Sequence, residues 1–111
     1  MTLALDTSVL LASLRADEPA HAACSTLIEA GGHSVYLHAL AETFASLTGG
    51  QHGRRVDADT ALRLLNESIL PFVKTVTLTE RDMLKVFGDA RARGIRGGAV
   101  YDALHLAAAR K

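Results

Sequence analysis

The sequence lacks the features that mark disulfide-linked, zinc-finger and membrane-spanning proteins. Its only cysteine is Cys24, so no internal disulfide and no zinc-finger spacing of cysteines is present. No apolar run approaches the roughly 20 residues that cross a bilayer, and no basic segment followed by a long apolar stretch stands at the N-terminus. These absences together predict a cytoplasmic protein.

The chain also has no excess of charge of either sign. Twelve Lys and Arg residues balance twelve Asp and Glu residues, so the overall field does not attract a polyanion. A nucleic-acid partner would therefore depend on a local basic patch. Two groups qualify, Arg54 with Arg55 and the trio Arg91, Arg93 and Arg96, although the solvated ends of helices explain both groups equally well.

What the chain does contain is enough apolar material for one globular domain. With 111 residues, 49% of them hydrophobic and 22% charged, it has the size and composition of a compact domain with one core.

Short apolar or β-branched runs alternate with longer runs of helical period. Strands are predicted at 2–5, 34–38 and 72–77, and helices at 8–14, 19–28, 40–50, 57–70, 80–94 and 99–109. Thr79 to Asp82 is close to a capping box and predicts the start of the fifth helix. The last helix is apolar on more than one side, which predicts that much of it is buried. Strands separated by helices predict an α/β fold with a mainly parallel sheet.

Three acidic residues fall where the chain should reach the carboxyl edge of this sheet. Asp6 ends the first predicted strand, Glu42 lies in the first turn of the helix after the second, and Asp102 lies in the first turn of the last helix. Ligands of open parallel sheets bind at that edge. All three acids sit in apolar stretches, where burial of unpaired carboxylates is costly. A hard cation such as Mg²⁺ or Mn²⁺ would offset that cost.

The same acids have a simpler explanation. Acidic residues near helix N-termini are stabilised by capping and by the helix dipole, with no metal required. The residues alone leave the two interpretations open.

Three sequence blocks carry a resemblance to a known family. LDTSVLLA at 5–12, HALAETFASLTG around Glu42 and YDALHLAAA at 101–109 look like the acid-bearing blocks of PIN domains, in the same order. Among these proteins, the short form is similar to VapC-type toxins of bacterial toxin–antitoxin pairs.

The resemblance implies a PIN-like three-layer α/β/α fold and cleavage of RNA that depends on Mg²⁺ or Mn²⁺. It gives Asp6, Glu42 and Asp102 the catalytic and metal-binding roles, and it implies a homodimer and a cognate antitoxin as inhibitor. A hydroxyl after the first acid, from Thr7 or Ser8, often assists at such sites, although capping of the first helix explains both residues as well.

The match departs from the family pattern after Asp102. PIN domains usually have a further strand followed by another acid, and no acidic residue occurs in 103–111. We therefore expect residues 1–111 to be a single PIN-like domain, C-terminally incomplete, with the last strand missing and the edge of the first strand exposed. This departure supports an alternative function, a catalytically weak or inactive binding or assembly module.

Two further interpretations are less well supported by the residues. Asp6 could be the acceptor of a phosphotransfer domain, but the haloacid-dehalogenase pattern needs an Asp where Ser8 stands. His105 shares a helical face with Asp102 and could line the site, but a partly buried histidine with an ordinary hydrogen bond is the simpler prediction.

Overall fold

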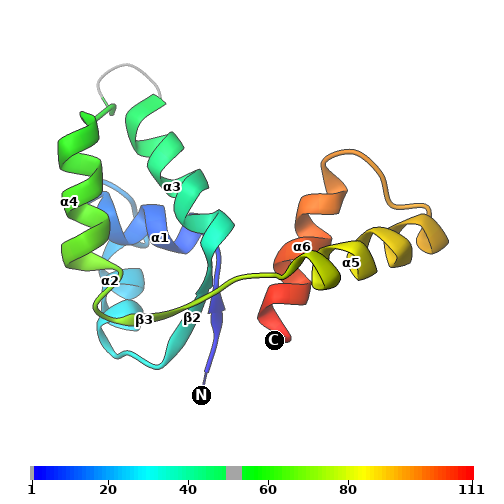
Figure 1. Cartoon of the computed structure of the whole chain (residues 1–111). Coiled ribbons are helices and arrows are strands. Elements are labelled where there is room, and N and C mark those ends of the chain that lie inside the picture. The colour runs from blue at the N-terminus through cyan, green and yellow to red at the C-terminus, as the bar shows by residue number, and fades with distance from the viewer. Residues whose placement is uncertain (1, 50–53) are drawn as a thin grey trace.

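The computed structural model describes residues 2–49 and 54–111, which form an α/β fold of six helices and three strands (Figure 1). The predicted fold class is confirmed. In chain order the elements are β1 (Ala4–Leu5), α1 (Thr7–Leu14), α2 (His21–Glu29), β2 (His33–Tyr36), α3 (Leu37–Gly49), α4 (Ala58–Ser68), β3 (Val73–Val76), α5 (Glu80–Arg93) and α6 (Ala99–Ala109).

The three strands form one parallel sheet in the order β1-β2-β3. Leu5 lies opposite Val35, and Val35 lies opposite Thr75. The carboxyl ends of the strands therefore meet at one edge, where α1, α3 and the segment leading to α5 begin. Within the described residues, β1 has a strand neighbour on one side only.

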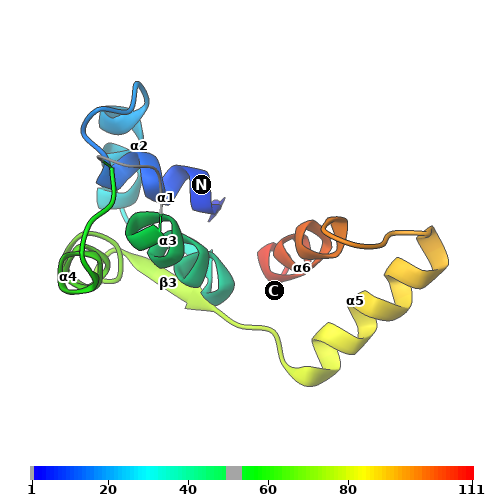
Figure 2. The ribbon, with the colours of Figure 1, turned by 90° about the horizontal axis from the view of Figure 1, so that it is seen from above.

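Successive residues of β2 point to opposite faces of the sheet and into different cores. Val35 is fully buried in a core built with α1–α4, whose other members include Leu10 and Ile28. The next residue, Tyr36, packs against a second core around Val86 and Leu104 of α5 and α6. Helices thus cover both faces, and in Figures 1 and 2 α5 and α6 form a pair that stands apart from α1–α4.

The helix termini follow the local sequence closely. Asp57 accepts a hydrogen bond from the Thr60 backbone N–H and begins α4. Thr79 and Asp82 form the reciprocal capping box of α5, so the predicted start of that helix is confirmed. Gly94 ends α5 with a φ of 70°, in the left-handed region that favours glycine.

The start of α3 corrects the prediction from sequence. The helix begins at Leu37, not Leu40, and β2 ends at Tyr36, not His38. The helical period already includes Ala39, which is buried on the same face as Thr43 and Leu47, so packing against the first core extends the helix. It ends at Gly49, and the neighbouring Gly50 lies outside the described residues.

The predicted burial of α6 is correct on one face only. Leu104 and Ala108 are buried, whereas Tyr101 and Leu106 are 54% and 48% exposed. This helix packs against α5 and β2, which cover a single stripe of its apolar surface. None of the helices in the described part of the chain is long and apolar enough to span a membrane.

Candidate active site

Asp6 follows β1 directly and caps the first turn of α1. Its Oδ1 accepts hydrogen bonds from the Ser8 hydroxyl at 2.7 Å and from the Val9 backbone N–H at 3.1 Å. The Ser8 hydrogen bond contributes most to lowering the pKa of Asp6. Those from the backbone and the charge interaction with His105 act in the same direction, and partial burial opposes them. The capping interpretation is therefore confirmed for Asp6, whose Oδ1 accepts the capping hydrogen bond.

Glu42 lies in the second turn of α3, because that helix starts earlier than predicted. Its Oε1 accepts a hydrogen bond from the Thr7 hydroxyl at 3.0 Å and lies 3.1 Å from His105 Nε2. An ionised carboxylate can only accept, so the imidazole N–H is the donor. The two hydroxyls that follow the first acid are thus used separately: Ser8 holds Asp6, and Thr7 holds Glu42.

His105 contacts Glu42 and lines the same groove as Asp6. It reaches Glu42 from α6, across 63 residues of sequence, and it faces Asp6 across the groove between β1 and α6. The predicted ordinary hydrogen bond is present, but its partner is one of the candidate catalytic residues. The sequence signal was the three-residue spacing from Asp102, which puts both residues on one helical face.

Asp102 lies in the first turn of α6, as predicted, and is exposed. It makes no hydrogen bond or ion pair with the other residues that the structure describes. In 2–49 and 54–111, no group of three or more His, Cys, Asp or Glu side chains is arranged to hold a metal ion. The structure therefore links Glu42 to His105 and to Thr7, the residue after Asp6, and Asp102 takes no part in these contacts.

The predicted burial of the acids is wrong. Asp6 and Asp102 are exposed, and the Glu42 side chain is 41% exposed. Apolar neighbours in sequence do not bury a residue when the element has two faces: Thr43 points into the first core, and Glu42 points out of it. The cost of burial consequently gives no argument for a cation here.

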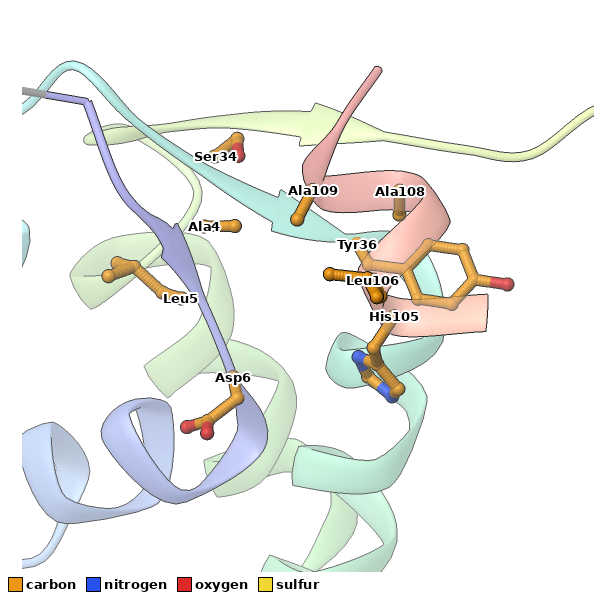
Figure 3. Close-up of a pocket in the computed structure, with 9 residues that line it drawn as sticks. All are labelled: Ala4, Leu5, Asp6, Ser34, Tyr36, His105, Leu106, Ala108 and Ala109. Atoms are coloured by element: carbon orange, nitrogen blue, oxygen red, sulfur yellow. The ribbon is translucent and has the colours of Figure 1, made fainter. Parts of the chain in front are cut away.

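A groove of about 240 Å³ runs between β1 and α6 beside these residues (Figure 3). Asp6 stands at its β1 end, and His105 projects from α6 on the opposite side. Ala4, Ser34 and the small residues at the end of α6 form its walls. The exposed side of β1 is therefore lined by carboxylate, imidazole and small apolar groups.

Four rings gather next to Glu42, those of Tyr36, His38, Tyr101 and His105, and no sequence pattern predicted this cluster. Tyr36 packs edge-on against His105 with ring centroids 5.1 Å apart. His38 and Tyr101 are stacked, at 5.4 Å and an interplanar angle of 7°. The predicted strand ended at His38, so its four-residue spacing from Glu42 was not interpreted as helical, whereas α3 contains both residues.

The basic residues divide between ion pairs and helix ends. Arg54 lies 2.6 Å from Glu18 and 3.5 Å from Asp17, and Arg91 and Arg93 lie in the last turn of α5, where cations interact favourably with the helix dipole. The predicted helix-end position is confirmed for Arg91 and Arg93, whereas Arg54 lies in the segment before α4 and is held by acidic residues instead.

Comparisons with known proteins agree with this architecture. The model of the PIN domain family matches residues 3–111. Ribonuclease VapC27 of Mycobacterium tuberculosis is 36% identical over 107 residues, which cover 96% of this chain and 76% of that protein. The crystal structure of VapC20 from the same organism, described as a sarcin–ricin loop cleaving toxin, aligns with a TM-score of 0.70. It is 19% identical, and the alignment covers 99% of this chain and 82% of VapC20. The chain belongs to the PIN-domain family and is of the VapC type.

Proposed function

We propose that this protein is a ribonuclease toxin that hydrolyses RNA phosphodiester bonds with Mg²⁺ or Mn²⁺. The observation that carries the proposal is that Glu42 contacts Thr7, the residue after Asp6, and also His105, which lines the same groove as Asp6. The VapC27 relative, itself named a ribonuclease, supports the same activity.

The two carboxylates suit a hard cation in donor type and number. Mg²⁺ is commonly bound by one or two carboxylates, with waters and substrate phosphates completing its coordination. The hydrogen bonds from the Ser8 hydroxyl and the Val9 N–H go to Oδ1 of Asp6, and those from Thr7 and His105 go to Oε1 of Glu42, so the proposal assigns the second oxygen of each acid to the cation. In the proposal Asp102 is the third metal-binding and catalytic acid.

When bound, the cation would polarise a phosphoryl oxygen and lower the pKa of a coordinated water. The chain's own contribution is to orient the carboxylate oxygens that would coordinate the cation. Ser8 and the Val9 N–H keep Asp6 ionised and fix its first oxygen. Thr7 and His105 fix Oε1 of Glu42 from two sides, which orients Oε2 without occupying it.

Inhibition by a cognate antitoxin, a homodimeric state and action in the cytoplasm belong to the same proposal. They follow from the VapC type of the chain. Light scattering would test the homodimer, and loss of RNA cleavage when a candidate antitoxin is added would test the inhibition.

The test compares Asp6→Asn, Glu42→Gln and Asp102→Asn with Asp89→Asn, a matched control on α5. We expect cleavage of structured RNA with Mg²⁺ or Mn²⁺ and none in chelator. Each site variant should lose roughly 10-fold or more in Mn²⁺ affinity or rate, and the control should retain both. A folded protein that cleaves no RNA, and whose titration with Mn²⁺ is unchanged by Asp6→Asn, would contradict the proposal.

A catalytically weak or inactive binding module is the second candidate. It is favoured by the position of Asp102, which makes no contact with the other two acids. Calorimetry that detects an antitoxin but no Mn²⁺ would support this candidate over the nuclease.

A further inference from the structure

The ring cluster consists of Tyr36, His38, Tyr101 and His105. It contains both tyrosines and two of the five histidines of the chain. They come from three separate elements, the end of β2, the first turn of α3 and α6. Rings that converge in this way from distant parts of the sequence require an explanation in packing or in binding.

Packing explains the inner rings but not the outer one. Tyr36 lies against the second core, and His105 is tied to Glu42. Tyr101 is 54% exposed, is not part of either core, and its hydroxyl makes no hydrogen bond within the described residues. It rests nearly parallel on His38, and an exposed ring stacked in this way contributes little to burial.

The stacked pair joins α3, which carries Glu42, to α6, which carries Asp102. His38 precedes Glu42 by one turn of α3, and Tyr101 precedes Asp102 directly in the first turn of α6. A planar group stacked on Tyr101 would therefore lie beside the proposed phosphodiester site.

We propose that the His38–Tyr101 stack binds an unpaired base of the RNA substrate, with Tyr101 as the ring that the base covers. Unpaired RNA bases commonly stack on aromatic and histidine side chains, and this contact tolerates any base because every base has a π face. A base paired inside a helix has both faces covered, so the site selects loops and single strands. This inference rests on the proposed function for the identity of the ligand as RNA.

The experiment measures stacking separately from cleavage. A short single-stranded RNA carrying 2-aminopurine is titrated with protein in chelator, where no hydrolysis occurs, and both fluorescence quenching and Kd are recorded. Wild-type protein and Tyr101→Phe should quench the probe. Tyr101→Leu should lose the quenching and bind about 5- to 150-fold more weakly, the range expected for one stacked base. Phe87→Leu, which changes an exposed aromatic residue on α5 outside the cluster, should behave as wild type.

Each result decides the proposal. It is overturned if Tyr101→Leu binds and quenches like wild type, or if the wild-type protein does not bind the probe. Cleavage with Mn²⁺ that is intact in Tyr101→Leu at low RNA concentration would overturn the stacking site and leave the nuclease standing. Quenching that depends on Tyr101 in a protein that cleaves no RNA would retain the binding site and reject the nuclease.

Discussion

The two cores of this molecule differ in how completely they exclude solvent. In the core shared by β1, β2 and α1–α4, Leu10, Val35, Ala39 and Ile69 are 0% exposed. In the core under α5 and α6, Leu78 and Val86 retain 9% and 8% exposure. The first core, here called the closed core, thus contains completely buried side chains, whereas every member of the second core retains some exposure.

The candidate site spans both cores, which makes the difference relevant to function. Asp6 and Glu42 are on elements of the closed core, and His105, Tyr101 and Asp102 are on α6. The first two acids are therefore positioned by the part of the fold that contains the most fully buried side chains. The contribution of α6 depends on how firmly the shallower core holds it.

Truncation in the closed core should have the largest effect. We expect Leu10→Ala to lower the free energy of unfolding by about 3–5 kcal/mol, because the cavity is enclosed and cannot be filled by water or by relaxation. Urea denaturation followed by circular dichroism measures the change. A loss below about 1 kcal/mol would mean that the core is not as tightly packed as its burial indicates.

The matching truncation in the second core should be milder and more local. We expect Leu104→Ala to cost about 2 kcal/mol, near the lower end for buried leucines. Hydrogen exchange should accelerate first in α5 and α6, with α1–α4 retaining their protection. Equal acceleration in both halves would show that the two cores unfold as one unit.

Loss of the capping box should have a smaller effect, again on the second half. Thr79→Ala removes the side-chain acceptor for the Asp82 N–H and should cost about 1 kcal/mol. Thr79→Ser, which keeps the hydroxyl, is the matched control. A thermal melt in which both variants unfold together would contradict this role.

The smallest effect concerns pH and the Asp82–Lys111 contact. The Lys111 ammonium, 2.7 Å away, together with the Thr79 hydrogen bonds, lowers the pKa of Asp82 from 3.8 to about 2. Because the folded-state pKa is the lower one, the stabilisation is present above 3.8 and is lost as the pH falls towards 2. Lys111→Met should raise the pKa of Asp82 in an NMR titration, and an unchanged pKa would exclude the contact in solution.

The sequence predicted features that depend on near neighbours and failed where distant contacts decide. The caps at Asp57 and Thr79 were predictable, because the donor and acceptor are three residues apart. The start of α3 was not, since the burial of Ala39 against the first core overrides the strand-like residues around it. His105 was set aside for the same reason: its partner, Glu42, is 63 residues away.

The placement of Asp6 and Glu42 was predictable because parallel strands end at a common edge. Their exposure was not, because the hydrophobicity of neighbouring residues does not reveal which face an acid occupies. The convergence of Asp102 with the other two acids stays a prediction.

The adjacent hydroxyls at the start of α1 have a mechanical consequence. Neighbouring residues of a helix point about 100° apart, so Thr7 and Ser8 can each hold a carboxylate on a different element. A rotation of α1 about its axis would carry Asp6 with the helix that it caps, whereas it would loosen the hydrogen bond from Thr7 to Glu42 on α3. The position of Glu42 relative to Asp6 should therefore depend on the orientation of one helical turn.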